Sequence, residues 1–498
     1  MSLGVVIARE ESPSTSEFFF VVRDKVSKGQ YVQLEHSQGR LFGYVAEMFK
    51  SNRYFERAES VAEFEKGGGM SNFPSSSWEH TVALVKILGV YNKGFERAFS
   101  PPSPGTEVSD AERELLQSFL GFDPHGMDLG TIEHHEVPAR ISMTRLLQKH
   151  FAILAMSGAG KSHLAGVLLE ELLSRKKEDG RVAVIVVDIH GEYMGFAHDP
   201  VFGPKTAVID GSSISVPLKK VAPEAIMEWL PNLSAPQRDM LRQALSDLRS
   251  KNRETEGYSF KELLLAIEMS EIARDEVKRA LRRSLMELKR YHFLSRKTEN
   301  PRLIADIKPG HLTVLDFSTI DSLRKKQILV ALLSRRLFSL RKKGRIPPFL
   351  LLIEEAHNFA REKAEESEAV SRSIIETIAR EGRKFGACLC LISQRPVNLS
   401  TTALSQCNTH IILRVTNPND LDHIQMSSEG IDARVAKSIT GLKVGEGILV
   451  GEAVNHPVFI KIRARKSEKR EKGAPLDQQA SQFESVREKR EKNVEAFV

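Results

Sequence analysis

The stretch Ala155-Met156-Ser157-Gly158-Ala159-Gly160-Lys161-Ser162 decides the fold of this chain. It follows an apolar run at 151–154 and precedes a helical pattern over 163–175. A strand, a loop of small residues ending in Lys-Ser, and a helix form the setting that a phosphate-binding P-loop requires. Backbone N–H groups of such a loop close around a polyphosphate, and the helix N-terminus attracts the same anion. The sequence therefore predicts an α/β protein with a nucleotide site here.

The loop residues have separate expected roles toward ATP and Mg²⁺. We expect Lys161 to contact the β- and γ-phosphates and the Ser162 hydroxyl to ligate Mg²⁺. Ala155 replaces the first glycine of the G-x-x-x-x-G-K-[ST] pattern, but Gly158 and Gly160 remain, so the loop can still close. The alternative is a Gly/Ser turn that carries Gly-Lys-Ser by chance. The expected nucleotide-binding residues are Ser157, Gly158, Ala159, Gly160, Lys161, Ser162, His163 and, outside the loop, Arg140.

Composition limits the class of protein. A chain of 498 residues is too long for one compact core, so we expect about two to four domains. Its apolar runs are strand-sized, and the N-terminus lacks a secretion leader, which favours a cytoplasmic protein without membrane spans. The cysteines Cys388, Cys390 and Cys407 give no disulfide framework. The net charge of +7 permits nucleic-acid binding without requiring it.

The pattern of strands and helices changes along the chain. Short strands rich in β-branched and aromatic residues fill the N-terminal part and predict a small β-barrel. Strands then alternate with helices, as in a mostly parallel α/β sheet, and one long helical stretch interrupts this alternation. The expected parts are a barrel at 1–98, a linker at 99–125, the first part of the ATPase core at 126–221, a helical insertion at 222–300, the second part of the core at 301–464, and a charged tail at 465–498.

A second apolar run, Phe349–Ile353, ends in Glu354 and Glu355. Two carboxylates at the end of a buried strand lie at the sheet edge where open α/β sheets bind ligands. We expect Glu354 to lie near the metal, directly or through water. Glu355 would orient and deprotonate the attacking water. The alternative is a surface pair of glutamates without a catalytic role.

Three further side chains are candidates for the catalytic step. Gln394 ends the apolar run at 387–393 and could contact the γ-phosphate and the attacking water; otherwise it is a polar strand cap. Phosphoryl transfer gains from a cation near the γ-phosphate, supplied in cis or in trans. Arg383 is the first candidate for a residue reaching a neighbouring subunit, and Arg380 is the second, ahead of Arg414 and Arg140. Arginines near a helix C-terminus also stabilise the helix dipole, which is the alternative role.

Several motifs occur in one order along the chain. The P-loop is followed by Asp188-Ile189-His190-Gly191-Glu192-Tyr193, then by Ile353–His357, Ser393-Gln394-Arg395-Pro396 and His410–Asn417. In this order they resemble the archaeal HerA helicases of the HerA/FtsK superfamily of P-loop ATPases. The resemblance covers almost the whole chain. Glu354 departs from it, because relatives often carry Asp there.

The resemblance implies a fold and a function. The fold would be a HAS-barrel-like N-terminal domain and a RecA-like P-loop ATPase domain with a helical insertion and a C-terminal tail that braces a neighbouring subunit. The function would be ATP-driven movement of a homohexameric ring along double-stranded DNA. The implied partners are the nuclease NurA and a repair ATPase–nuclease pair, in DNA end resection for double-strand-break repair.

Two other functions stay open at this point. A ring ATPase could move a protein instead of DNA, and a nucleotide-gated scaffold could recruit a nuclease without turnover. Candidate DNA contacts are Arg395 with the loop at 396–402, and Lys205. For Asp188, His190 and Glu192 we expect proximity to the nucleotide site; the alternative is a turn at a strand end.

Overall fold

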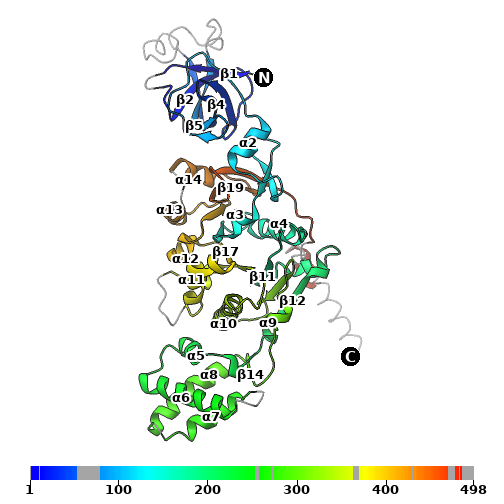
Figure 1. Cartoon of the computed structure of the whole chain (residues 1–498), viewed down its shortest axis with the longest axis vertical. Coiled ribbons are helices and arrows are strands. Elements are labelled where there is room, and N and C mark those ends of the chain that lie inside the picture. The colour runs from blue at the N-terminus through cyan, green and yellow to red at the C-terminus, as the bar shows by residue number, and fades with distance from the viewer. Residues whose placement is uncertain are drawn as a thin grey trace. The chain divides into compact units, whose positions relative to one another are not determined.

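The computed structural model describes residues 2–9, 12–52, 79–252, 257–271, 273–362, 369–428, 430–431, 433–468, 477–481 and 483–484 (Figure 1). Of the tail expected at 465–498, the structure describes 465–468, 477–481 and 483–484. The other residues of the tail lie outside the described part of the chain. The chain forms two compact units. The first unit comprises Met1–Glu171, Ala379–Arg383 and Cys388–Ala464. The second unit comprises Leu172–Ile378, Lys384–Ala387 and Arg465–Val498.

The N-terminal part of the first unit is a closed β-barrel, drawn in blue in Figure 1. Six strands follow the order β2-β1-β7-β3-β4-β5, and β5 pairs back with β2. Alternate residues such as Phe18, Phe20, Val32 and Leu34 point inward and form the core, as the period of two requires. The expected β-barrel is therefore confirmed, but its strand β7 lies within the range expected for the linker, 99–125. The strands are β1 (Ser2–Ile7), β2 (Glu17–Val22), β3 (Tyr31–His36), β4 (Gly39–Asn52), β5 (Glu79–Tyr91), β6 (Phe95–Glu96), which extends β5, and β7 (Glu107–Asp110).

The rest of the first unit contains the P-loop strand. In it β10 pairs in parallel with β17 on one side and β18 on the other, and an antiparallel series β18-β19-β20-β8-β9 follows. All four residues of β10 are buried, because both faces of the strand are covered. The elements are α2 (Arg113–Leu120), β8 (Met127–Ile132), β9 (Pro138–Ile141), α3 (Met143–Leu147), β10 (Phe151–Leu154), α4 (Lys161–Ser174), β17 (Ala387–Ser393), α12 (Thr401–Ser405), β18 (Thr409–Ile412), α13 (Pro418–Ser427), α14 (Ala433–Thr440), β19 (Glu446–Gly451) and β20 (Val458–Ile462). Helix α4 continues past Glu171 into the second unit.

The second unit contains a parallel sheet of its own, in the order β12-β15-β11-β16. The near-continuous apolar sequences of β11, β15 and β16 agree with strands that are buried on both faces. The strands are β11 (Ala183–Asp188), β12 (Thr206–Asp210), β15 (Leu312–Asp316) and β16 (Phe349–Ile353), and two short strands, β13 (Val216–Pro217) and β14 (Leu294–Ser295), pair separately. The helices α9 (Leu303–Asp306) and α10 (Leu323–Lys342) and most of α11 (Arg372–Glu381) also belong to this unit.

Four helices lie within the range expected for the helical insertion, and they appear in green in Figure 1. Two of them begin with capping boxes, in which Ser234 pairs with Gln237 and Ser259 pairs with Glu262. Each box satisfies backbone N–H groups that a first helical turn leaves free. The helices are α5 (Pro223–Trp229), α6 (Ala235–Lys251), α7 (Phe260–Glu268) and α8 (Asp275–Lys289).

Candidate nucleotide-binding site

The P-loop runs from the end of β10 to the start of α4. Gly158 and Gly160 have φ angles of +77° and +106°, which L-residues with side chains rarely adopt. A Cβ on Gly158 would meet nothing within 4 Å, and one on Gly160 would meet only the backbone N of Gly445 at 3.7 Å. Open space therefore lies beside both glycines. Ala155 is not among the residues with positive φ, so its position does not need a glycine.

Two neighbouring strands hold the start of the loop. The N–H of Ala155 donates to the carbonyl of Ser393 at 3.2 Å, and the N–H of Met156 donates to the carbonyl of Arg414 at 2.9 Å. Gln394 directly follows Ser393 and is half-buried. Its backbone therefore enters the same sheet edge as the P-loop, within the first unit.

The other expected nucleotide-binding residues differ in their surroundings. Lys161 is 8% exposed in the first turn of α4, Ser162 is half-buried, and Ser157 is exposed, while Ala159 is buried. His163 contacts the carbonyl of Arg463 through Nε2 at 2.8 Å. Arg140, on β9, donates to the carbonyl of Pro124 at 3.0 Å. Both contacts are with the chain itself, and the expected roles of His163 and Arg140 toward the nucleotide stay predictions.

A cluster of carboxylates lies at the ends of β11 and β16 in the second unit. Glu354 is 3% exposed, and its Oε2 accepts a hydrogen bond from the N–H of Ile189 at 3.1 Å. Burial, and next the charge of Asp188, raise the pKa of Glu354 to about 9. The charges of Glu192 and Glu355 add to this increase. Carboxylates held this close together disfavour full ionisation, and a bound cation would reverse that preference.

Glu355 has an unusual backbone conformation. Its φ is +47°, in the left-handed region, and its side chain is buried. Its carbonyl accepts from the N–H of Asn358 at 2.8 Å, and its Oε2 lies 3.5 Å from Nδ1 of His357. A residue other than glycine in this region stores strain, which is common at functional sites. In this turn the side chain of Glu355 leaves the backbone in a different direction from that of a residue in extended conformation.

Asp188 organises the turn that follows β11. Its carboxylate accepts hydrogen bonds from the N–H groups of His190, Glu192 and Tyr193, at 3.2, 3.0 and 2.9 Å. Burial raises the pKa of Asp188, and Asp316 adds to this effect, while the backbone hydrogen bonds oppose it. The sequence motif therefore forms a strand-end turn, and the same turn places Asp188 and Glu192 close enough to Glu354 to influence its pKa.

The candidate arginines are accessible. Arg380 and Arg383, at the end of α11 and just after it, are exposed, as are Arg395 and Arg414. Burial alone would raise the pKa of Glu452, but its hydrogen bond and ion pair with Lys149, and the charge of Arg383, hold it below its usual value. Lys205 donates to the carbonyl of Leu173 near the end of α4 at 2.7 Å. That contact gives Lys205 a role in the fold.

The sequence is similar to those of known P-loop helicases. A family model described as "Helicase HerA, central domain" matches residues 127–337. The "DNA double-strand break repair helicase HerA" of Pyrococcus furiosus is 29% identical, with 92% of each chain covered. The protein of the same name from Saccharolobus solfataricus is 28% identical, covering 93% of this chain and 92% of that one. Residues 127–337 therefore match the HerA central domain, and most of the chain is similar to HerA helicases.

Solved structures support the fold of this chain. VirB4 of Thermoanaerobacter pseudethanolicus matches with a TM-score of 0.55 at 17% identity, covering 69% of this chain and 98% of that one. The conjugative coupling protein TrwB, in an unbound form, matches with a TM-score of 0.50 at 12% identity, covering 73% of this chain and 94% of that one. At these identities the matches concern the fold alone. The expected α/β architecture with a P-loop ATPase domain is confirmed.

An arginine that was not predicted from the sequence organises the P-loop helix. Arg463, just after β20, donates to Glu170 Oε2 at 2.7 Å and to Glu171 Oε1 at 2.8 Å. Its Nε donates to the carbonyl of Asp128 at 3.0 Å, and its own carbonyl contacts His163. Glu170 is fully buried. Two adjacent glutamates inside the otherwise apolar helix α4 were the sequence feature that could have indicated such a partner.

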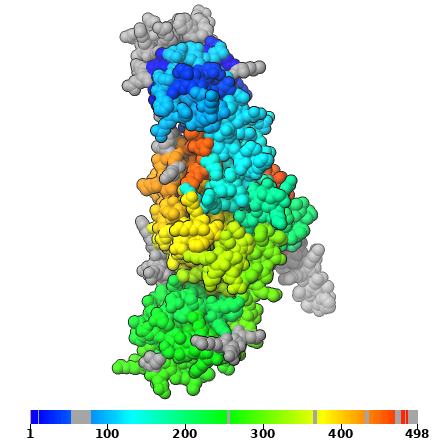
Figure 2. All heavy atoms as spheres, in the orientation of Figure 1, coloured from blue at the N-terminus to red at the C-terminus, as the bar shows by residue number. Residues whose placement is uncertain are grey.

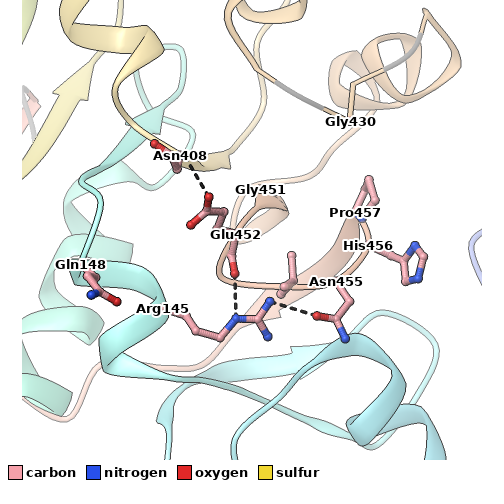
Figure 3. A pocket seen from close by; sticks show the side chains of 10 residues that line it. Arg145, Gln148, Asn408, Gly430, Gly451, Glu452, Asn455, His456 and Pro457 are labelled. Carbon is pink, nitrogen blue, oxygen red and sulfur yellow. Dashed lines mark hydrogen bonds between the residues drawn. The ribbon is translucent and has the colours of Figure 1, made fainter. Parts of the chain in front are cut away.

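The first unit also contains a polar pocket of about 540 Å³ that includes no P-loop residue (Figure 3). Arg145 crosses it, donating to the carbonyl of Glu452 at 2.8 Å and to Oδ1 of Asn455 at 3.0 Å. A third bond, 3.1 Å long, reaches the carbonyl of Gly121 at the end of α2. These bonds connect α3 with the turn between β19 and β20. Because each nitrogen of the guanidinium donates one of these bonds, we interpret the pocket as a structural junction of the fold.

Within the ranges that the structure describes, no helix has both the length and the apolar character that a bilayer crossing requires.

Proposed function

We propose that this chain is an ATP-driven helicase and translocase that acts on double-stranded DNA as a homohexameric ring. One observation supports this proposal most directly. The P-loop of the first unit keeps two positive-φ glycines beside open space at the N-terminus of α4, in a chain related over nine-tenths of its length to proteins named HerA helicases. A cytoplasmic location is part of the proposal, because the protein would find its chromosomal DNA substrate there.

The residues present fit ATP and Mg²⁺. The open space beside Gly158 and Gly160 suits phosphate oxygens, which need close backbone approach without side chains. Lys161 and Ser162 offer the ammonium and hydroxyl groups that phosphates and a hard cation prefer. Glu354 adds a carboxylate in a strongly acidic neighbourhood. When bound, Mg²⁺ would neutralise charge on the β- and γ-phosphate oxygens.

In this proposal each side chain has one task. Lys161 holds the β- and γ-phosphate oxygens, and Ser162 and Glu354 hold the metal. Glu355 accepts a proton from the attacking water, and Gln394 orients that water. The loop and Gln394 belong to the first unit and the glutamates to the second. We propose that both groups act on one nucleotide.

The names of the relatives support the proposed substrate. The relatives from Pyrococcus furiosus and Saccharolobus solfataricus are named double-strand-break repair helicases, which favours DNA as the substrate. We include the nuclease NurA and a repair ATPase–nuclease pair as partners in end resection. The NurA partnership is testable by mixing the two purified proteins and measuring the mass of the assembly.

Removal of the Lys161 ammonium tests nucleotide binding. Hydrogen bonds to charged groups contribute about 1.5–3 kcal/mol, so Lys161→Ala is expected to weaken ATP binding by about 10- to 100-fold. The fold should persist, because the change removes a charge and little core volume. Titration with a fluorescent ATP analogue measures the effect. Lys176→Ala, at an exposed position beyond α4, is the matched control and should bind normally. Equal affinity of both variants would contradict the assigned role of Lys161.

Arg383 is proposed to stabilise the γ-phosphate in a neighbouring subunit, with Arg380 as the second candidate. In that case Arg383→Ala and Glu355→Gln subunits, each inactive alone, should recover part of the ATPase activity when mixed. Mixed interfaces would then combine an intact Arg383 with an intact Glu355. ATPase rate as a function of the mixing ratio measures this. Activity that never exceeds that of either variant alone would place Arg383 in cis or in a structural role near Glu452.

The proposed function is tested by ATPase activity with and without duplex DNA. We expect stimulation by duplex DNA that falls steeply as salt rises, because phosphate contacts release counterions. Stimulation by protein substrates alone would favour a protein-moving ring. Nucleotide binding without turnover would favour a scaffold that recruits a nuclease.

A further inference from the structure

Helix α8 has two faces of opposite character. Leu281, Leu285 and Leu288 are buried, and α8 packs with α6 and α7. On the other side Arg279, Arg282, Arg283 and Arg290 are exposed; we call these four residues the α8 arginine face. At 3.6 residues per turn these four side chains fall within about 100° of the helix circumference. The segment that carries them is drawn in green in Figure 2.

Most of this positive charge has no partner within the protein. Arg282 lies 3.5 Å from Glu268 of α7. In the described part of the chain, Arg279, Arg283 and Arg290 have no carboxylate within ion-pair distance. Their neighbour Lys278, in contrast, pairs with Asp275 at 3.6 Å. Three exposed guanidinium groups on one surface repel one another, so an anionic partner would be favoured there.

The surface has the length and shape of a site for an extended anion. It forms a shallow hollow of about 510 Å³ lined by Arg279, Arg282, Arg283, Met286, Glu287 and Arg290. From Arg279 to Arg290 the helix rises about 16 Å, at 1.5 Å per residue. One strand of duplex DNA carries a phosphate about every 3.4 Å along its axis, so the surface can follow several phosphates.

The residue type suits phosphate as a partner. Every cation that lines the hollow is an arginine, whose planar guanidinium can bind two phosphate oxygens at once. Glu287 is the one acidic residue that lines the hollow. The simpler explanation is a solvated helix face. It accounts for the exposure of the arginines but gives no reason for the absence of carboxylate partners around three of them in the described structure.

We propose that the α8 arginine face binds the phosphate backbone of duplex DNA, outside the ATPase core. This inference rests on the proposed DNA-dependent function and names a second surface for the same substrate. It uses no base contacts, so binding there does not depend on sequence. Its contribution is to the affinity and the salt dependence of DNA binding.

The test uses the full-length protein and a duplex DNA probe of mixed sequence. The variant Arg279→Ala/Arg283→Ala/Arg290→Ala removes the three arginines without ion pairs. The slope of log affinity against log salt concentration should become less negative by about one to three, since each lost phosphate contact changes that slope by about 0.9. Affinity at low salt should fall by tenfold or more. The variant with lysine at the same three positions should keep most of the slope.

A charge-matched control separates this surface from net charge. Arg23→Ala/Lys25→Ala/Arg97→Ala removes three exposed charges from the barrel end of the chain and should leave the slope unchanged. ATPase activity without DNA should be unchanged in both triple variants. An equal loss of slope in the two, or no loss in either, overturns the proposal. If the α8 variant loses as much affinity for polyglutamate as for duplex DNA, the surface binds acidic polypeptides. That result also overturns the proposal.

Failure of the inference can be told apart from failure of the proposed function. If the wild-type protein does not bind duplex DNA in a salt-dependent way, the proposed function is wrong and the inference falls with it. If the wild-type protein binds and the α8 variant binds equally well, only the inference is wrong.

Discussion

Glu355→Gln should stop ATP hydrolysis while ATP binding persists. The amide keeps the size of the side chain but cannot take a proton from the attacking water. Loss of a general base costs about 10²- to 10⁴-fold in rate. Single-turnover hydrolysis of radiolabelled ATP measures the chemical step directly, and equilibrium titration measures binding.

Folding is not at risk in this variant. Removal of one negative charge beside Glu354 relieves repulsion in the carboxylate cluster, so the pKa of Glu354 should fall and stability should not decrease. Glu96→Gln, at an exposed position on β6, is the matched control and should hydrolyse ATP normally. Wild-type turnover by the Glu355→Gln variant would show that another group accepts the proton.

Arg463→Ala should loosen the helix that follows the P-loop. The change leaves Glu170 fully buried without its cation, and removal of one partner from a buried ion pair costs about 3–5 kcal/mol. A loss of that size should speed hydrogen exchange at the amides of α4 by about two to four orders of magnitude if these amides exchange through opening of the first unit. Exchange monitored by mass spectrometry measures it. Nucleotide affinity should fall as well, because α4 begins at Lys161.

Two comparisons make the Arg463 result specific. Arg242→Ala breaks an exposed pair with Asp239 and should cost less than about 1 kcal/mol. The double variant Arg463→Met/Glu170→Leu replaces the buried pair by apolar groups and should recover much of the lost protection. Normal exchange in the Arg463→Ala variant would mean that Glu170 finds another partner or is neutral.

Local patterns in the sequence were enough to predict much of the fold. The four apolar residues before the P-loop form β10, and the small-residue loop leads directly into α4, because strand, turn and helix are each set by neighbouring residues. The aromatic and β-branched runs form the barrel, since a small closed sheet needs that alternation. The apolar run before Glu354 forms β16.

Contacts between distant parts of the chain could not be predicted. Arg463 lies almost 300 positions after Glu170 and Glu171, and no local pattern links them. The left-handed backbone at Glu355 results from the turn that the surrounding fold imposes, and the residue type does not indicate it. Lys205 was a candidate for DNA contact, yet its ammonium binds the carbonyl of Leu173. The expected roles of Gln394, Arg380 and Arg383 stay predictions.

The central claim is that Lys161 and Glu355 act on the same nucleotide. A structure of the full-length protein with Mg²⁺, duplex DNA and a non-hydrolysable ATP analogue tests it directly. We expect Lys161 Nζ within about 3 Å of a β- or γ-phosphate oxygen, and a Glu355 oxygen within reach of the γ-phosphate through one water. Glu355 more than about 10 Å from the γ-phosphate of every bound nucleotide, its own or a neighbour's, would contradict the claim.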